Sequence, residues 1–428
     1  MRRTVRFSAI LAFAPCLLAA QTATSVPRPR VVNGFDATRL ARIDRALQSY
    51  VDSNKIAGAV ALVLYEGQPV YEKAVGWADK ESGRRMTTDA IFRIASQSKA
   101  ITSTAVLMLV EEGKIALQDP VSRFIPQFAH TTVATRSDGG PRIIPAKREI
   151  TIHDLLTHTS GISYGTDSLI ASTYAQQGLG PAAGWGWYTA DKNEPICTTM
   201  GRLGNLPFVS QPGEKWVYGY SIDVLGCVIE RASGIPLDQF IRTRITDPLG
   251  MKDTFFFIPP DKRQRLVTVY MNDSAGRLER APDNAKGQGH YVEGPRRNFS
   301  GGAGLLSTIH DYGRFLQMLA NGGQLDGVRI LAPRTVMLMT TNQVDTLLKS
   351  FSPCSGFGLA FGIHDRFGCD DFSSVGTYYW GGAYGSSYQV DPKEHLIILY
   401  MENRLPRRPD ISSRIPPLVY QALVDPRT

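Results

Sequence analysis

A serine and a lysine three residues apart, Ser96 and Lys99, are the first residues in this sequence whose types and spacing suggest chemistry. They stand at the start of an apolar helical pattern that runs from Ala100 to Glu112. Residues three apart share one face of a helix, so the amine can take the proton of the hydroxyl. The helix N-terminus also favours the negative charge that then develops. The pair predicts a serine nucleophile with a lysine base.

The four residues 96–99 also have a purely structural interpretation, a helix cap followed by a solvated lysine. Residues elsewhere in the chain must therefore decide between a catalytic and a structural role. One candidate is Tyr218, on a loop directly before a second helical pattern, where a phenol can face a cleft. Another is the stretch 379–384, in which Gly381 and Gly382 leave room for a ligand beside a strand. The corresponding structural interpretations are a buried tyrosine with a bonded hydroxyl and a strand bulge.

Ser163 is a rival nucleophile, because residues 161–165 match the G-x-S-x-G turn of alpha/beta-hydrolases. That motif needs a strand before it and a helix after it. Here a capping box at Thr151 and Asp154 predicts a helix before it, and a loop rich in Ser, Thr and Gly follows. We therefore expect Ser163 not to be the nucleophile.

Composition argues against a nucleic-acid or metal-binding role. The 428 residues are 43% hydrophobic and 20% charged, which suits a globular protein with a substantial core. The net charge of +8 falls to +5 without Arg2, Arg3 and Arg6, and no basic run is interleaved with aromatic residues. His153 and His158 are five apart, a spacing that does not align them on one helix face. We expect no nucleic-acid partner, no metal and no organic cofactor.

The N-terminus has the pattern of a secretory signal in residues 1–20, with a basic start, an apolar run and small residues at its end. The run is too short to span a bilayer, and no other stretch is apolar enough to do so. Pro15, directly before Cys16, argues against lipid attachment at that cysteine. We expect a periplasmic or secreted protein without a membrane span, with residues 21–35 as a leader.

Four cysteines remain once the signal is removed, and an exported chain can oxidise them in three pairings. Cys354 and Cys369 flank a Gly-rich loop, which makes them the expected pair. Cys227 lies in an apolar helical pattern that suits a buried thiol, and Cys197 is the remaining cysteine. The sequence leaves the pairing and the oligomeric state open.

Strand patterns gather at the two ends of the chain and helical patterns in its middle. Three helices are expected at 37–51, 96–112 and 416–424. Further helices are expected to begin near Thr151, Ser221, Pro236 and Thr308. The expected strands are 56–64, 69–77, 377–380, 387–390 and 396–401, and long loops over a cleft are expected in 161–215, with Trp185 and Trp187.

This order predicts an α+β fold in which one antiparallel sheet, flanked by helices, is built from both chain ends. We expect the sheet-containing part to comprise 36–100 and 295–425. A mainly helical part, 101–294, is inserted between them.

Six motifs occur in one order along the chain: S-x-x-K at 96–99, L-L-T-H-T-S-G at 155–161, P-G-x-x-W-x-Y at 212–218, D-V-L-G at 223–226, G-x-G-L-x-S-T at 302–308 and W-G-G at 380–382. Together they resemble the serine beta-lactamase-related hydrolases close to class C beta-lactamases. The W-G-G variant is most similar to the family VIII carboxylesterases and related acyltransferases. The resemblance spans residues 36–425 and implies the fold of beta-lactamases and penicillin-binding proteins.

The resemblance also implies roles for residues at matching positions. Ser96 would be the nucleophile, Lys99 its proton acceptor and Tyr218 the phenol that passes the proton to the leaving group. Which of Lys99 and Tyr218 is the base stays open. The backbone N–H groups of Ser96 and Ala383 would form the oxyanion hole. Trp380, Gly381, Gly382 and Tyr384 would contact substrate.

Two departures from the related lactamases affect the expected substrate. Tyr220 stands at the third position of their Y-x-N motif, and Trp380 replaces the lysine of their K-T-G strand. A cation there would bind the carboxylate of a beta-lactam or of a peptide C-terminus. Its absence favours uncharged, short acyl esters, with weak beta-lactam hydrolysis as a side activity.

The expected function is therefore a serine carboxylesterase that works through an acyl-enzyme on Ser96, with a small-molecule ester as its substrate. The alternatives are a beta-lactamase or D-amino-peptidase, an acyltransferase, and a non-catalytic envelope binding protein. Acyl and alcohol specificity are left open.

Overall fold

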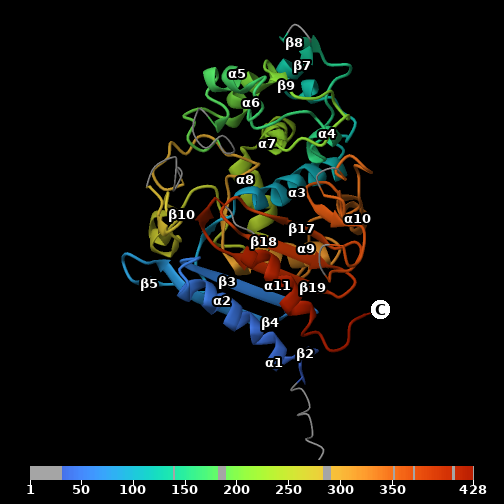
Figure 1. The fold of residues 1–428 in the computed structure, drawn as a ribbon. Coiled ribbons are helices and arrows are strands. Elements are labelled where there is room, and N and C mark those ends of the chain that lie inside the picture. Colours follow the sequence, from blue (N-terminus) through green and yellow to red (C-terminus); the bar gives the residue numbers. More distant parts are fainter. Residues whose placement is uncertain are drawn as a thin grey trace, which may run out of the picture.

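The computed structural model describes residues 31–137, 140–181, 189–282, 291–349, 352–369, 372–406 and 410–427. Its largest element is an eight-stranded antiparallel sheet in the order β15-β16-β17-β18-β19-β3-β4-β5. The strands are β3 (Gly58–Tyr65), β4 (Gln68–Asp79), β5 (Arg84–Arg85), β15 (Ser355–Phe357), β16 (Gly362–His364), β17 (Tyr378–Gly381), β18 (Ser387–Asp391) and β19 (Leu396–Met401). The pairing of β19 with β3 joins the two chain ends, as predicted (Figure 1).

The two faces of the sheet are covered by different helices because alternate residues of each strand point to opposite sides. Ala59, Ala61 and Val63 of β3 pack with α2 (Arg42–Asp52) and α11 (Asp410–Tyr420). We call this side the outer face. Val60 and Leu62 point to the inner face, which faces α9 (Ile309–Ala320) and the helical part of the molecule.

Helix α3 (Ser98–Glu111) lies between the sheet and the helical part (Figure 1). It is apolar on nearly all sides and buried from Ser98 to Leu109, as its sequence predicts for a helix inside a core. The short 3-10 turn η1 (Ala95–Gln97) leads into it, and α7 (Ser221–Ser233) packs against it. Gly234 ends α7 in the left-handed conformation.

The remaining elements frame the upper part of the molecule and the loops. The helices are α1 (Ala37–Leu40), α4 (Ile152–Leu156), α5 (Ala171–Gln176), α6 (Ile196–Gly204), α8 (Leu237–Ile241) and α10 (Pro333–Met339). The short strands are β1 (Val31–Val32), β2 (Phe35–Asp36), β6 (Phe92–Arg93), β7 (Thr132–Ser137), β8 (Gly140–Pro145), β9 (Pro207–Phe208), β10 (Tyr270–Asn272), β11 (Leu278–Arg280), β12 (Leu306–Ser307), β13 (Gln324–Leu325), β14 (Val328–Arg329) and β20 (Arg404–Leu405). The upper part is thus not helical alone, since β8, β7 and β9 form a small sheet there.

The closing helix begins earlier than predicted. It spans Asp410–Tyr420 rather than 416–424, with Pro416 and Pro417 inside it. Ile411, Ile415 and Val419 recur every four residues and are fully buried against the sheet. Burial of this stripe therefore outweighs the backbone hydrogen bonds that the prolines cannot make. The stretch 161–215, predicted as loops, contains the short α5 and α6, while Trp185 and Trp187 lie outside the described residues.

Both cysteine pairs are disulfide-bonded. The expected bond between Cys354 and Cys369 is confirmed. The interpretation of Cys227 as a buried thiol is wrong, because it pairs with Cys197. Helices α6 and α7 pack side by side and bring the Cα atoms of the two cysteines to within 4.8 Å of each other. The sequence pattern of either helix does not predict this contact between them.

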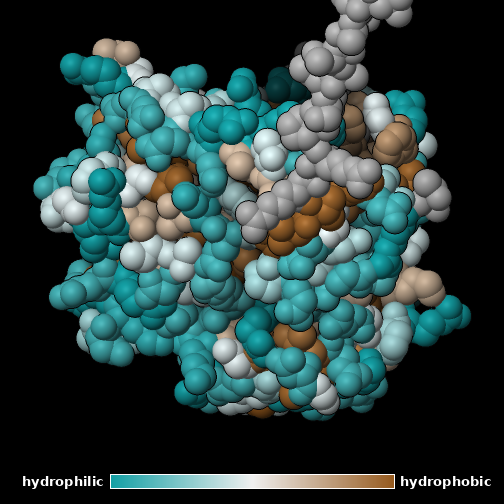
Figure 2. All heavy atoms as spheres, turned by 90° about the horizontal axis from the view of Figure 1, so that it is seen from below, coloured by the Kyte–Doolittle hydropathy of each residue, from teal (hydrophilic) through white to brown (hydrophobic). Residues whose placement is uncertain are grey.

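The underside of the molecule is mostly hydrophilic, with hydrophobic groups showing between the polar side chains (Figure 2). Among the described residues, no helix combines the length and hydropathy needed to cross a bilayer.

Candidate active site

Ser96 and Lys99 meet as their spacing predicts. Ser96 lies in η1, directly after Ala95, which adopts a left-handed φ of 43° in a fully buried position. The Lys99 side chain is buried one turn later, and its Nζ lies 3.1 Å from Ser96 Oγ. A non-glycine residue held at positive φ next to a reactive group is typical of a functional site.

Two further oxygens fix the lysine. Lys99 Nζ donates to the Gly302 carbonyl at 2.7 Å and lies 3.2 Å from the hydroxyl of Tyr164. The Lys99 amine thus has three oxygen partners, from the Ser96 hydroxyl, from a turn and from a phenol. A buried amine needs such partners, because burial without them is costly.

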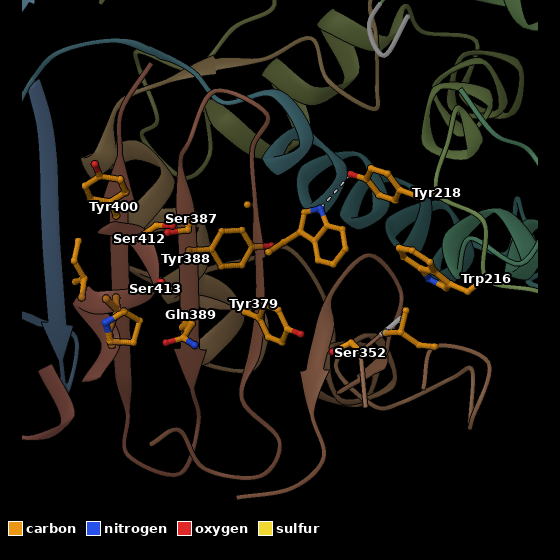
Figure 3. Close-up of a pocket in the computed structure, with 16 residues that line it drawn as sticks. Trp216, Tyr218, Ser352, Tyr379, Ser387, Tyr388, Gln389, Tyr400, Ser412 and Ser413 are labelled. Atoms are coloured by element: carbon orange, nitrogen blue, oxygen red, sulfur yellow. Dashed lines mark hydrogen bonds between the residues drawn. The ribbon is translucent and has the colours of Figure 1, made fainter. Parts of the chain in front are cut away.

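Tyr218, the phenol expected beside Lys99, is present but oriented differently from a direct hydrogen-bond partner. Its ring lies over Lys99 Nζ, with 4.6 Å between nitrogen and ring centroid. Its hydroxyl accepts a hydrogen bond from Trp380 Nε1 at 3.2 Å (Figure 3). The ring is stacked on Trp216 at 5.7 Å. Its predicted role as proton relay stays a prediction.

Tyr164 is the site residue that sequence reasoning missed. It lies 65 positions beyond Lys99, on the loop after α4. Burial raises the pKa of its phenol well above 10, and the neighbouring Tyr218 and Asp223 add to the shift. The phenol is therefore protonated at neutral pH. Tyr164 lies inside the G-x-S-x-G match at 161–165, directly after Ser163. The sequence motif points to the serine and gives no separate indication of the tyrosine.

Ser163 has a structural role in this loop. It is almost fully buried, and its Oγ accepts the backbone N–H of Gly165 at 3.0 Å. Gly165 adopts φ 74°, and a Cβ there would come within 2.7 Å of the Tyr174 ring. The G-x-S-x-G sequence thus builds a tight turn that presents Tyr164.

Gly219 allows the two tyrosine-bearing loops to touch. A Cβ at Gly219 would lie 2.3 Å from the Ile162 carbonyl oxygen, so only glycine permits this approach. Tyr220, at the third position of the Y-x-N motif, packs edge-on against the Tyr164 ring with 4.9 Å between centroids, and its hydroxyl accepts a hydrogen bond from Gly180 N at 3.2 Å. The side chain that replaces the asparagine therefore bonds a backbone amide outside the Ser96 and Lys99 pair.

A buried carboxylate fixes the turn that holds Lys99. Asp223 Oδ1 accepts hydrogen bonds from Ser300 Oγ at 2.5 Å and from Gly302 N at 3.1 Å. Burial raises the pKa of Asp223, whereas the positive charge of Lys99 and these hydrogen bonds act in the opposite direction. A Cβ at Gly302 would lie 2.3 Å from Asp223 Oδ2, which explains the glycine.

His158 fills the space behind Tyr218. Its ring centroid is 4.7 Å from that of Tyr218, and it also contacts Trp216 and Phe357. Burial, and next the charge of Lys99, hold its pKa well below 6.5, so the imidazole is neutral. Its carbonyl accepts the N–H of Val217 at 2.8 Å, which joins the motif at 155–161 to the loop of Tyr218.

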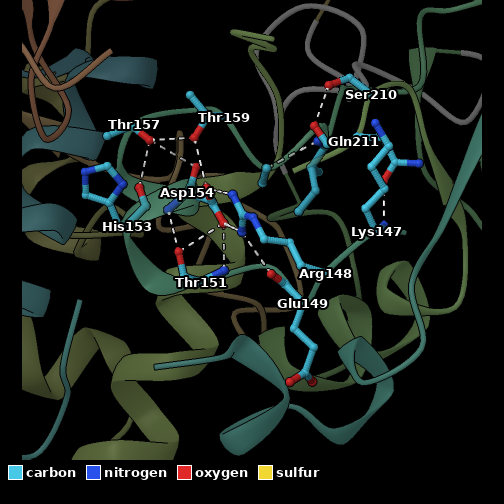
Figure 4. Close-up of polar contacts among 12 residues, drawn as sticks. Lys147, Arg148, Glu149, Thr151, His153, Asp154, Thr157, Thr159, Ser210 and Gln211 are labelled. Atoms are coloured by element: carbon cyan, nitrogen blue, oxygen red, sulfur yellow. Dashed lines mark hydrogen bonds and ion pairs between the residues drawn. The ribbon is translucent and has the colours of Figure 1, made fainter. Parts of the chain in front are cut away.

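Asp154 lies among the polar contacts of the segment that leads to His158 (Figure 4). It closes the predicted capping box with Thr151 and forms a two-pronged ion pair with Arg148, at 2.5 and 2.9 Å. Burial favours the protonated carboxyl, but the hydrogen bonds from Arg148 and Thr151 outweigh it and lower the pKa of Asp154 below 3.8. Thr159 also donates to this carboxylate, so the start of α4 and its end are tied together.

Strand β17 borders the site with Trp380, Gly381 and the following Gly382. A Cβ at Gly382 would come within 2.5 Å of the Ile94 carbonyl oxygen, so glycine lets the strand approach the segment before Ser96. Ala383 follows directly and is half-buried. Tyr384 does not fit its expected role as a substrate contact. The chain turns after Gly382, and Tyr384 is fully buried among Ala95, Val269, Ala281 and Leu405.

A cavity of about 620 Å³ opens beside Tyr218 and Trp380 (Figure 3). It is lined by aromatic and aliphatic side chains and by glycine, serine and glutamine residues. No described residue of the lining is charged. The described residues also contain no group of three His, Cys, Asp or Glu placed to hold a metal ion.

Comparison with known proteins decides the family. The family profile described as Beta-lactamase matches residues 43–416. The chain belongs to this family. With Ser96 and Lys99 in its S-x-x-K motif, it is an enzyme, a serine hydrolase of the beta-lactamase fold.

Several relatives cover nearly the whole chain. Esterase EstB of Burkholderia gladioli is 33% identical over 385 residues, which are 86% of this chain and 92% of EstB. Protein Rv1367c of Mycobacterium tuberculosis is 35% identical over 377 residues, 84% of this chain and 89% of its own. The solved structure of EstCE1, described as a hydrolase with promiscuous acyltransferase activity, superposes with a TM-score of 0.77 at 26% identity and covers 91% of this chain and 99% of its own.

Proposed function

We propose that this beta-lactamase-family serine hydrolase is a carboxylesterase that cleaves uncharged esters with short acyl groups. One observation carries the proposal: Ser96 Oγ and Lys99 Nζ lie 3.1 Å apart, and the Tyr218 ring that covers Lys99 Nζ lines a cavity whose described lining has no charged side chain. The relation to an esterase at 33% identity supports it. A cationic anchor for a carboxylate, which a beta-lactam or a peptide C-terminus would need, is missing from that lining.

The proposed reaction has two halves. Lys99 takes the proton of Ser96 while Oγ attacks the ester carbonyl, and the backbone N–H groups of Ser96 and Ala383 stabilise the oxyanion. The proton that Lys99 took then passes through a phenol hydroxyl to the departing alkoxide, so that lysine and phenol return to their starting states, and the acyl group stays on Ser96. Water, deprotonated by the same groups, attacks the acyl-enzyme and releases the acid.

Two phenols are available for the proton transfer, and we assign them different roles. Tyr218 corresponds by resemblance to the relay tyrosine, and its hydroxyl is held at the mouth of the cavity by Trp380. Tyr164 contacts Lys99 directly, and we propose that it positions the amine. Lysine and phenols at such distances titrate as one coupled system.

The test compares two chromogenic substrates, p-nitrophenyl butyrate and nitrocefin. We expect kcat/KM for the ester to exceed that for the lactam by more than about 100-fold, which corresponds to about 2.7 kcal/mol of discrimination in the transition state. A comparable turnover of nitrocefin would favour a beta-lactamase instead. Absence of any turnover together with no labelling by a fluorophosphonate would favour a non-catalytic binding protein.

An acyltransferase is the second candidate, because EstCE1, whose structure is similar, is described as having promiscuous acyltransferase activity. In that reaction an alcohol replaces water in the second half. Addition of 1-butanol during hydrolysis of p-nitrophenyl butyrate distinguishes the two. A carboxylesterase gives mainly butyric acid, whereas an acyltransferase gives mainly butyl butyrate.

We also propose that the enzyme is exported, on the basis of the basic and apolar pattern of residues 1–20. Two disulfides in the described chain suit an oxidising compartment. Fractionation of expressing cells and N-terminal sequencing of the product test this. We expect protein outside the cytoplasm that lacks the first 20 or so residues.

A further inference from the structure

The cavity that Tyr218 and Trp380 line extends onto the outer face of the sheet. Trp216, Tyr218 and Trp380 line one end, next to the catalytic lysine. The other end is lined by β18, by β19 and by Ser412, Ser413, Ile415 and Pro416 of α11 (Figure 3). A long pocket therefore begins at Tyr218, whose ring lies over Lys99, and reaches α11.

Small residues create this space. Gly381 of β17 pairs with Ser387 of β18, and Ser387 pairs with Tyr400 of β19. These three positions point to the same face, and two of them carry little or no side chain. Farther along the sheet α2 and α11 cover this face, and Ile398 and Tyr400 pack beneath them. The row formed by Gly381 and Ser387 leaves the gap open.

The lining determines what can bind. Aromatic rings come from Trp216, Tyr379, Trp380, Tyr388 and Tyr400, and aliphatic groups come from Leu348, Ile398, Ile415 and Pro416. No described lining residue carries a charge. The volume of about 620 Å³ lies in the range of pockets for drug-sized organic ligands. Such a site favours a bulky, uncharged, apolar group and disfavours a carboxylate or an ammonium ion.

We propose that this pocket, defined by Trp216, Trp380, Ser387, Ile398 and Ser413, binds a large aryl or branched aliphatic group of the ester. The proposal rests on the proposed carboxylesterase function and names its substrate class. The natural substrate is then an uncharged ester with one short and one bulky apolar half. Ser387 and Ser413, on opposite walls, are specificity-determining positions.

The test uses ethyl acetate, 2-naphthyl acetate and ethyl 2-naphthoate, with acid release followed in a pH-stat. In the unmodified enzyme, we expect kcat/KM for at least one naphthyl ester to exceed that for ethyl acetate by more than tenfold. Ser387→Trp fills the pocket from the sheet side. It should lower the ratio of the preferred naphthyl ester to ethyl acetate at least tenfold.

Two further variants make the outcome decisive. Ser413→Trp fills the pocket from α11, and because Ser413 is solvent-exposed the substitution leaves the core unchanged. It should lower the same ratio even if Ser387→Trp fails to fold. Ser49→Trp, on an exposed position of α2 away from the pocket, is the matched control and should leave the ratio unchanged.

The results separate this inference from the function on which it rests. If ethyl acetate is hydrolysed but naphthyl esters are not preferred, the pocket assignment is wrong while the carboxylesterase assignment stands. The same holds if Ser413→Trp leaves the ratio unchanged. If the unmodified enzyme hydrolyses neither p-nitrophenyl butyrate nor any of the three esters, the proposed function itself fails, and this inference fails with it.

Discussion

Lys99 Nζ has three oxygen partners, and each comes from a different part of the chain. Ser96 is its neighbour on the same turn, Gly302 belongs to a turn about 200 positions later, and Tyr164 lies between them in sequence. The first contact follows from spacing and was predictable. The others depend on tertiary packing, so the local pattern of residues could not reveal them.

The dependence of contacts on tertiary packing also explains the different outcomes of the predictions for Tyr218 and Tyr384. Tyr218 was found because its motif resembles that of a family, and the structure places its ring on the lysine. The resemblance assigned Tyr384 to the site together with its neighbour Trp380, but the turn after Gly382 sends the Tyr384 side chain into a separate core cluster. Proximity in sequence predicts proximity in space only where the backbone continues in one direction.

The two phenols should respond differently to loss of the hydroxyl. Tyr218→Phe removes the proposed proton donor, and we expect kcat/KM for p-nitrophenyl butyrate to fall by roughly 10² to 10⁴-fold. Tyr164→Phe removes one of three partners of Lys99, and we expect a smaller loss with a shifted pH profile. A larger loss for Tyr164→Phe than for Tyr218→Phe would make Tyr164 the relay.

At the scale of elements, the turn at 300–302 links α3 to α7. Gly302 accepts from Lys99 of α3 and donates to Asp223 of α7, while Thr102 of α3 donates to the Gly301 carbonyl at 2.8 Å. Gly302 was recognised from the sequence as part of the motif at 302–308. Its partner Asp223 was noted only as part of a family motif, because a helical pattern does not say which buried carboxylate faces a turn.

Helices with one apolar stripe were predicted well, and segments whose pattern is irregular were not. The helices α7 and α9 agree with their caps and periodicity. The closing helix was placed late because Pro416 and Pro417 indicated a start, whereas packing on the sheet keeps them inside the helix. The small sheet of β7, β8 and β9 was missed, since its short strands lack a clear alternation.

Asp223→Asn should separate activity from stability. The raised pKa of Asp223 means that the folded state binds a proton more tightly than the unfolded chain, so the ionised carboxylate costs stability above about pH 3.8. Asparagine keeps an acceptor for Ser300 and Gly302 and removes that cost, so we expect an unchanged or higher Tm at pH 7. The buried charge beside Lys99 is lost, and we expect kcat/KM to fall at least tenfold.

Asp238→Asn is the matched control for this variant. Asp238 lies on α8, and burial raises its pKa as well, but in the described structure it has no hydrogen bond or ion pair with Ser96, Lys99 or Tyr218. Its replacement should leave kcat/KM unchanged. An Asp223→Asn enzyme with activity within twofold of the original would show that the carboxylate charge has no part in positioning Lys99.

At the scale of the whole molecule, the arrangement of strands at both chain ends predicted the main architecture. One antiparallel sheet joins β3 to β19, and helices flank it, as expected for this fold. The order of elements was sufficient for this, because two sets of apolar strands must share a core. The bond between Cys197 and Cys227 was not predictable in the same way, since it depends on how α6 lies on α7.

The acid sensitivity of the fold should depend on His158. Its pKa is lowered in the folded state, so unfolding takes up a proton, and its stabilising effect is complete above pH 6.5 and declines as the pH falls below that value. Its contribution to the free energy of unfolding should decline by up to about 1.4 kcal/mol per pH unit. Urea unfolding between pH 7.5 and 5.5 measures this decline.

His158→Phe should reduce that slope, because phenylalanine fills the aromatic pocket and does not titrate. His130, which is exposed, provides the control variant His130→Phe, whose slope should equal that of the unmodified protein. An undiminished slope in His158→Phe would place the acid-sensitive group elsewhere.

The central claim, that Ser96 is the nucleophile, is tested most directly by locating a covalent label. Trypsin cleaves after Arg93 and Lys99, so Ser96 falls in the peptide Ile94–Lys99, separate from Ser163. After reaction with a fluorophosphonate, we predict one adduct per chain, located on Ser96 by tandem mass spectrometry, absent in Ser96→Ala and retained in Ser163→Ala. An adduct on Ser163, or labelling that persists in Ser96→Ala, would contradict the assignment.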